Sequence, residues 1–169
     1  MKKTMVVLLV ALVLGALGIA PVMADAGVNV SSVAAGATIG AVNSAAGFTS
    51  GPRSTVDGDI TAVAGVTIGT EGKVNGDVTA GAGFASGNKA KIKGSVKAKI
   101  GFTSGSNSTI GGDVTVGADF TSGANSIISG DVTATGSITL GAGSKIVGSV
   151  HSGNGKIIYG KGATVGSVN

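Results

Sequence analysis

The chain has 169 residues, of which 32 are glycine and none is cysteine or tryptophan, and its formal net charge is +4. Glycine at this level, with no three-residue period and only two prolines, excludes collagen, and Val, Ile and Ala at fixed spacing exclude a disordered tract. Only 12% of the residues are charged, so apolar burial and backbone hydrogen bonds must hold a single domain together.

Residues 1–24 are predicted to form an export signal. Lys2 and Lys3 give a basic start, an apolar run follows, and Val22-Met23-Ala24 fits a small-residue cleavage site. The alternative is an uncleaved membrane anchor, although the apolar run is short for a span. We therefore expect a secreted or cell-surface protein, membrane-anchored if the segment is retained. The absence of cysteine excludes a disulfide framework.

Residues 25–39 are interpreted as an N-terminal partial coil, and residues 40–169 then repeat with a fixed period. The tripeptide Gly-(Asp/Ser)-(Val/Ile) begins at seven evenly spaced positions: Gly58, Gly76, Gly94, Gly112, Gly130, Gly148 and Gly166. Gly40-Ala41-Val42 extends this series upstream by one more period. A fixed period of this length is typical of a solenoid, in which stacked coils bury apolar residues that no single coil can bury.

The positions within each repeat fall into columns, which we number from the anchor glycine as column 1. Columns 3, 9 and 17 hold large apolar residues, and columns 5, 11 and 15 hold mostly Ala or Ser. Where column 9 is Phe, column 11 is the small residue Ser. Where column 9 is the smaller Val66 or Ile138, column 11 is the larger Ile68 or Leu140. Positions that exchange volume in this way share one interior. The pattern predicts an all-β, single-domain, three-sided β-helix with 18-residue coils and three short strands per coil.

Glycines in columns 1, 8 and 12 are predicted to form the three corners of each coil. The proposed reason is that glycine adopts backbone angles that other residues avoid.

The two ends of the repeat resemble each other. Gly36–Asn43 nearly repeats as Gly162–Asn169, and both segments share a variant turn that lacks column 18. Neither end shows the charged cap that a solenoid normally needs to stay soluble. Uncovered strand edges favour pairing with another chain, so we expect copies to stack end to end. The expected contact residues are Val28, Val30, Val165 and Val168.

The segment Gly130–Val150 resembles a bactofilin repeat, with the cadence "G-D-V-x-A … I-x-L-G-x-G-x-x-I-x-G-x-V". The resemblance to this family of polymer-forming cytoskeletal proteins spans roughly residues 40–169. It implies a right-handed triangular β-helix that polymerises end to end without nucleotide. Left-handed hexapeptide acyltransferases are the other candidate solenoid. Their three sides repeat one six-residue pattern, whereas here two sides read large then small and the third reads small then large.

The sequence shows no catalytic arrangement, and we predict a structural protein that is not an enzyme and uses no cofactor or metal. His151, the only histidine, falls in outward column 4, and its coil contains no carboxylate or Cys. The inward serines of column 11 have no partner base. Column 2 stacks Asp59, Asp77, Ser95, Asp113, Asp131 and Ser149. Neighbouring carboxylates could share calcium, but the Gly-Gly-x-Gly-x-Asp repeat of calcium-binding solenoids is absent.

Two outward surfaces are candidate interaction sites. The lateral face, predicted to allow close contact between filaments, is defined by the column 10 threonines Thr49, Thr67, Thr103, Thr121 and Thr139. The basic patch is defined by Lys89, Lys91, Lys93, Lys97 and Lys99. This patch could meet anionic cell-surface polysaccharide or membrane lipid, although a solvated surface is the simpler interpretation. Ice binding by the threonine row is an alternative function, but known ice faces usually carry two such rows. The expected partner is the chain itself, with no nucleic acid.

Overall fold

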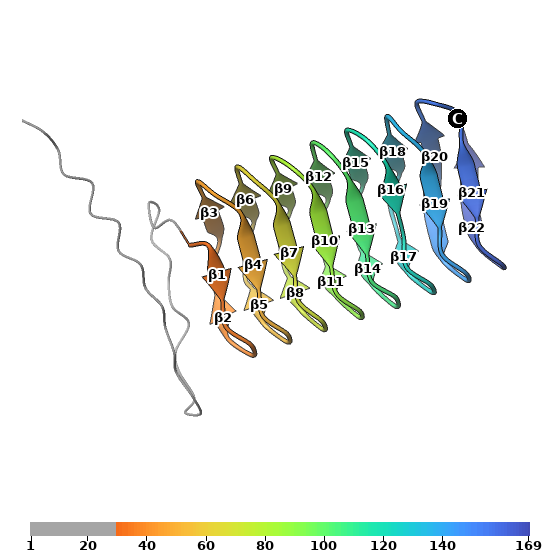
Figure 1. Ribbon diagram of the computed structural model, residues 1–169. Coiled ribbons are helices and arrows are strands. Elements are labelled where there is room, and N and C mark those ends of the chain that lie inside the picture. Colours follow the sequence, from red (N-terminus) through yellow and green to blue (C-terminus); the bar gives the residue numbers. More distant parts are fainter. Residues whose placement is uncertain (1–29) are drawn as a thin grey trace, which may run out of the picture.

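The computed structural model describes residues 30–169, which form a stack of coils built from strands and turns only. Figure 1 shows the coils following one another along the stack from the N-terminal end to the C-terminal end. The predicted export signal and Val28 lie outside the described residues. The longest ladder of single strands has eight members, so the chain is an all-β solenoid of about eight turns. The solenoid fold is the one that the repeat predicts.

Three parallel ladders run along the stack, one for each strand of the coil. The first ladder, columns 3–5, comprises β3 (Val42–Ser44), β6 (Ile60–Ala62), β9 (Val78–Ala80), β12 (Val96–Ala98), β15 (Val114–Val116), β18 (Val132–Ala134), the second half of β20 (Lys145–Ser152) and the end of β22 (Thr164–Val168). The second ladder, columns 9–11, comprises β1 (Ser32–Val33), β4 (Phe48–Ser50), β7 (Val66–Ile68), β10 (Phe84–Ser86), β13 (Phe102–Ser104), β16 (Phe120–Thr121), β19 (Ile138–Leu140) and β21 (Ile157–Tyr159). The third ladder, columns 16 and 17, comprises β2 (Thr38–Ile39), β5 (Thr55–Val56), β8 (Lys73–Val74), β11 (Lys91–Ile92), β14 (Thr109–Ile110), β17 (Ile127–Ile128), the first half of β20 and the start of β22.

Register follows the sequence period in the interior of the stack and departs from it at both ends. Phe84 pairs with Phe102, which lies one full period later. At the N-terminal end Ser32 pairs with Thr49, one residue short of a full period. At the C-terminal end Ile138 pairs with Ile157, one residue more than a full period. Ile157 therefore takes column 9 in the last coil.

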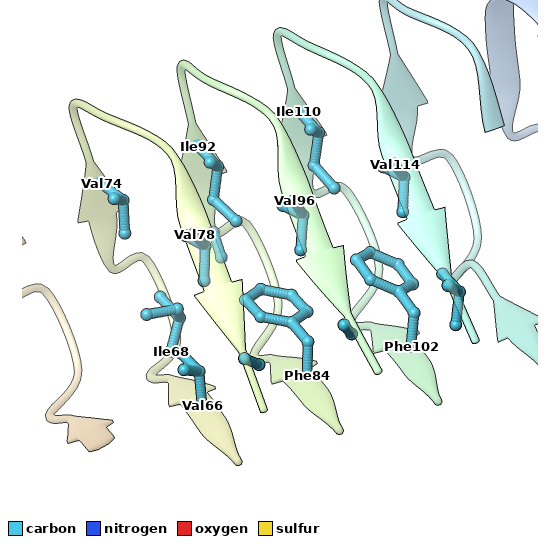
Figure 2. Packing of buried hydrophobic residues seen from close by; sticks show 14 of the residues in the cluster. Val66, Ile68, Val74, Val78, Phe84, Ile92, Val96, Phe102, Ile110 and Val114 are labelled. Carbon is cyan, nitrogen blue, oxygen red and sulfur yellow. The ribbon is translucent and has the colours of Figure 1, made fainter. Parts of the chain in front are cut away.

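The core is a single apolar interior that runs the length of the stack. Columns 3, 9 and 17 are buried in every interior coil, and Figure 2 shows their side chains pointing inward from successive coils. Phe84, Phe102 and Phe120 stack with ring centroids 5.1 and 4.8 Å apart and rings within 14° of parallel. The spacing matches the separation of neighbouring strands, so one aromatic ladder fills the interior beside the small column 11 serines.

The buried serines form hydrogen bonds with backbone groups at the turns. In column 11, the Oγ atoms of Ser50, Ser104 and Ser122 each accept from the amide of the next coil's column 12 glycine at 3.1–3.2 Å. In column 15, serine hydroxyls donate to column 12 carbonyls, such as Ser144 Oγ to Gly141 O at 2.7 Å. No buried side-chain nitrogen or oxygen among the described residues lacks a partner. These serines therefore satisfy the turns that they adjoin.

The reason predicted for the corner glycines is wrong for most of them. In column 12, a Cβ on Gly123 would lie 2.5 Å from the carbonyl carbon of Gly105 in the preceding coil, yet this residue has no positive φ. The turn with positive φ is instead column 14, where Arg53, Glu71, Lys89, Asn107 and Asn125 have φ between 55° and 59°. Glycine in column 12 is therefore required by close backbone approach between coils, not by its backbone angles.

Candidate functional site

The C-terminal end of the stack presents strand edges with exposed apolar side chains. Among the described strands, β21 pairs only with β19, and β22 only with β20. Tyr159 and Val168 occupy inward columns 11 and 3 but remain 46% and 56% exposed. Val165, in column 17, is half-buried against the core. These side chains would become buried if another coil were placed on this end.

The N-terminal end of the described stack is also open. Within residues 30–169, β1, β2 and β3 each pair with one strand, in the following coil. Val30 and Val33 are only partly buried and pack against the core. The sequence predicted Val30 but missed Val33, which lies in column 11 because the leading coil is one residue short. No residue from 30 to 52 is charged, so this end of the stack is electrically neutral.

The lateral face forms one row on the second ladder. Thr103, Thr121 and Thr139 occupy matching positions in successive strands, and Thr49 pairs with Thr67 two coils earlier. All five threonines of this face point away from the core, and Thr139 is half-buried while the others are exposed. The structure therefore brings the predicted residues together on one parallel sheet, with Ala85 as the one interruption.

The basic patch wraps around one corner, from the end of one coil to the start of the next. Lys91 lies on β11 of the third ladder and Lys97 on β12 of the first, and all five lysines are exposed. Lys89 Nζ lies 3.8 Å from Glu71 Oε1, and both side chains are largely in water. Such an exposed pair contributes little to stability. The patch is a cationic ridge that has no enclosed binding site.

A shallow groove of about 450 Å³ follows the outer surface of the first ladder from β12 to β20. Its polar lining comes from Lys97, Lys99, Thr115, Thr133, Thr135 and His151. His151 Nδ1 lies 3.0 Å from the carbonyl oxygen of Asn169 in the next coil, and its ring is exposed. These side chains point into solvent from a regular sheet, so the groove provides cations at one end but no buried polar group.

The column 2 carboxylates form a ladder that the sequence did not reveal. Asp59 Oδ1 accepts from the amide of Asp77 at 2.8 Å, and Asp77 Oδ1 accepts from Ser95 N at 2.7 Å. Ser95 Oγ, Asp113 Oδ1 and Asp131 Oδ1 continue the series to the next coil. The only available signal was that column 2 contains side chains that can accept a hydrogen bond. These carboxylates hold one coil to the next through backbone amides.

Asp131 accepts two hydrogen bonds from the next coil. Hydrogen bonds from the backbone amide and the hydroxyl of Ser149, at 2.7 and 3.0 Å, lower the pKa of Asp131 from its usual 3.8. Because the folded-state pKa lies below the unfolded value, the ionised carboxylate favours the folded chain. That contribution is fully present above pH 3.8 and is lost as the pH falls through the lower folded-state pKa.

We therefore expect the urea midpoint of unfolding to fall as the pH drops below 3.8, and to fall less in the Asp131→Asn variant. Asparagine keeps an acceptor oxygen but does not titrate, so it removes this group's share of the pH dependence. Urea titrations of both chains at neutral and acidic pH measure the effect. Identical acid dependence in the two chains would contradict a role for the Asp131–Ser149 contact.

Other kinds of site find no support in the described part of the chain. Within residues 30–169, no three His, Asp or Glu side chains are grouped so that they could hold a metal ion. That same stretch contains no helix long and apolar enough to cross a membrane. No protein-family model, curated protein or solved structure matches this chain. The ends of the stack and its outward faces are thus the candidate functional surfaces.

Proposed function

We propose that this protein is an exported structural protein that assembles into filaments by stacking its β-helix coils end to end. The observation that carries the proposal is the exposure of core columns at the C-terminal end, where Tyr159 and Val168 lie beside the open edges of β21 and β22. An open strand edge with apolar side chains is a template for pairing with another chain. Such a role requires no catalytic residue and no cofactor.

Backbone pairing and apolar burial would provide most of the free energy of this assembly. The N-terminal segment, residues 30–52, carries no charged side chain, so it forms no ion pair across a junction. Salt screening therefore has little effect on the junction, and filaments should persist at high ionic strength.

Export is proposed from the sequence of residues 1–24. Sequencing the N-terminus of the protein released by cells tests for cleavage after Ala24 or Ala26.

Replacing Val168 with lysine is expected to abolish filaments. Val168 is 56% exposed in the single chain, so Val168→Lys should fold normally, but an assembled junction would trap the new charge in an apolar interface. An unpaired buried charge costs about 3–5 kcal/mol, which should raise the critical concentration at least about 100-fold. Sedimentation and negative-stain electron microscopy measure the loss of assembly.

Val147→Lys is the matched control for this experiment. Val147 has a similar exposure, 52%, but it lies on the side of the stack in outward column 18. Its lysine would remain in water after assembly, so this variant should form filaments as readily as the original chain. Equal assembly of the two lysine variants would sink the end-to-end proposal.

The lateral face supports a second contact, between neighbouring filaments. Its exposed side chains are small and uncharged apart from Asp119 beside the row, so two such sheets could approach closely. Substituting lysine at Thr67, Thr103 and Thr121 should leave single filaments intact and remove bundles, because like charges would then face each other along the strip. Electron microscopy distinguishes the two forms, and bundles that survive the triple substitution would argue against this contact.

A further inference from the structure

The two ends of the stack share a corner that is one residue shorter than the interior corners. In an interior coil, three residues separate the third ladder from the first, as between Val56 and Ile60. At the N-terminal end only two residues separate Ile39 from Val42, and at the C-terminal end only two separate Val165 from Val168. The short corner thus occurs in the first and last coils, on the surfaces where a second copy would dock.

Each short corner fits imperfectly onto the coil beside it in the same chain. At the C-terminal end, β22 pairs with β20 through a register shift between Ile146 and Ser149. At the N-terminal end, the corner between Ile39 and Val42 has two residues, whereas the corner beside it, between Val56 and Ile60, has three. A short corner that faces another short corner needs no such bulge. The corners therefore match each other better than they match their own neighbours.

The side chains beside the two corners also correspond. If Gly162–Asn169 of one copy met Gly36–Asn43 of the next, Thr would stack on Thr, Val on Ile, Val on Val and Asn on Asn. Within the chain, too, residues of the same type stack on one another in successive coils: Phe84 pairs with Phe102, and Lys73 with Lys91. Along columns 14–17 and 1–4, such a junction would reproduce the coil-on-coil packing already present within one chain. In column 12 it would place Ala34 against Gly160, so the two backbones must lie further apart at that corner than at the interior corners.

The backbone hydrogen-bond pattern extends across the same junction. In column 9, each amide donates to the column 8 carbonyl of the next coil, as Ile138 N does to Lys156 O at 3.0 Å. In column 14, Gly143 N donates likewise to Lys161 O at 2.9 Å. One coil further on, the donors would be the amides of Ile157 and Gly162. With a second copy in register, their acceptors would be the carbonyls of Val30 and Ala35 of that copy.

We infer that copies join head to tail, with Gly162–Asn169 of one chain stacked in register on Gly36–Asn43 of the next, which gives a polar filament. This inference rests on the proposed function and adds the polarity and register of the contact. Two alternatives join like ends, and either would place strands antiparallel across the junction, whereas all described strand pairs are parallel. Joining two C-terminal ends would also bring together Lys156 and Lys161 of both copies, whereas the N-terminal segment carries no charge.

Cysteine crosslinking tests this arrangement directly, because the chain has no cysteine of its own. Thr38 and Thr164 are both exposed and both lie in column 16, at opposite ends of the stack. Across the inferred junction their Cα atoms would lie about 4.8 Å apart, within the range that a disulfide spans. The Thr38→Cys and Thr164→Cys chains, expressed full-length and processed by the cell, are oxidised separately and as an equal mixture, then separated on a denaturing gel.

The mixture is expected to form covalent dimers, and each variant alone is expected to stay monomeric on the gel. A mixture of Thr38→Cys with Asn169→Cys is the matched negative control, because these exposed residues lie on different sides of the coil. Asn43→Cys with Asn169→Cys provides a second positive pair in column 4, for the case that the first substitutions disturb assembly. Neither positive pair should crosslink in the Val168→Lys background.

The outcomes separate this inference from the proposed function. Filaments that form normally but give no dimers in either positive mixture would overturn the head-to-tail register and leave end-to-end assembly standing. Covalent dimers from one variant alone would show that like ends meet, which also overturns the inference. Chains that stay monomeric by sedimentation and give no crosslinks would overturn both.

Discussion

Replacing Phe102 with alanine is expected to lower the free energy of unfolding by about 3–5 kcal/mol. Phe102 is 2% exposed and is the middle of three stacked rings, with neighbours at 5.1 and 4.8 Å. Its removal leaves a cavity that the stacked coils above and below cannot close, because their backbones are tied by the ladders on each side. Denaturant titration of Phe102→Ala beside Thr103→Ala, an exposed neighbour on the same strand, measures the difference.

A compensated pair tests whether the two columns share volume. Val66 and Ile68 occupy columns 9 and 11 of one coil, where Phe102 and Ser104 stand in another. We expect Phe102→Val to destabilise the chain and the addition of Ser104→Ile to restore part of the loss, because the total volume is then recovered. Ser104→Ile alone should destabilise by overpacking. If Ser104→Ile were equally harmful in both backgrounds, the columns would not share one interior.

Gly123→Ala is expected to destabilise the chain by about 3 kcal/mol, the upper end of the usual range for overpacking. The new Cβ would lie 2.5 Å from the carbonyl carbon and 2.6 Å from the carbonyl oxygen of Gly105. Both are backbone atoms within a paired coil, so neither can rotate away. The substitution must therefore separate two coils or break the hydrogen bonds around that corner.

Gly101→Ala is the matched control for Gly123→Ala. The nearest atom to a Cβ at Gly101 is the carbonyl oxygen of Asp119 at 3.7 Å, which is ordinary contact. The same column already contains Asp119 and Ser137 in later coils. We expect Gly101→Ala to change the free energy of unfolding by less than about 1 kcal/mol. Equal losses in the two variants, measured by denaturant titration, would contradict the close-approach explanation.

The regular interior of the fold could be predicted because each column recurs in several coils, so its residue preference is visible in one sequence. Eight anchors fix the period, and the exchange of Phe48 and Ser50 for Val66 and Ile68 identifies which columns face inward. The aromatic stack at Phe84, Phe102 and Phe120 follows from that register. Repetition therefore replaces the information that an alignment of relatives would provide.

The corner geometry could not be predicted from residue type. Column 14 adopts positive φ while it contains Arg53, Glu71, Lys89 and Asn107, and no shared chemistry marks these residues as left-handed. Column 12 is glycine in every coil from Gly51 onward, but a sequence does not show whether glycine is needed for its angles or for close approach. The distance from Gly123 to the backbone of Gly105 decides in favour of close approach.

The candidate site was predicted in part. The near repeat of Gly36–Asn43 and Gly162–Asn169 identified matching ends, and the row of threonines on the second ladder is present as expected. Val33 was missed because a coil one residue short shifts its column. The hydrogen bond that Asp59 accepts from the Asp77 amide was missed, because the sequence does not distinguish a carboxylate that accepts from a backbone amide from one that binds a cation.

The most direct test of end-to-end assembly is cryo-electron microscopy of filaments formed by the unmodified chain. Eight strands per ladder at about 4.8 Å each predict an axial repeat of about 38 Å per chain, with the strand spacing unbroken across the junction between copies. Filaments with that repeat and continuous ladders are the expected result. A chain that stays monomeric at every concentration, or that associates only through its sides with gaps between the ends, would contradict it.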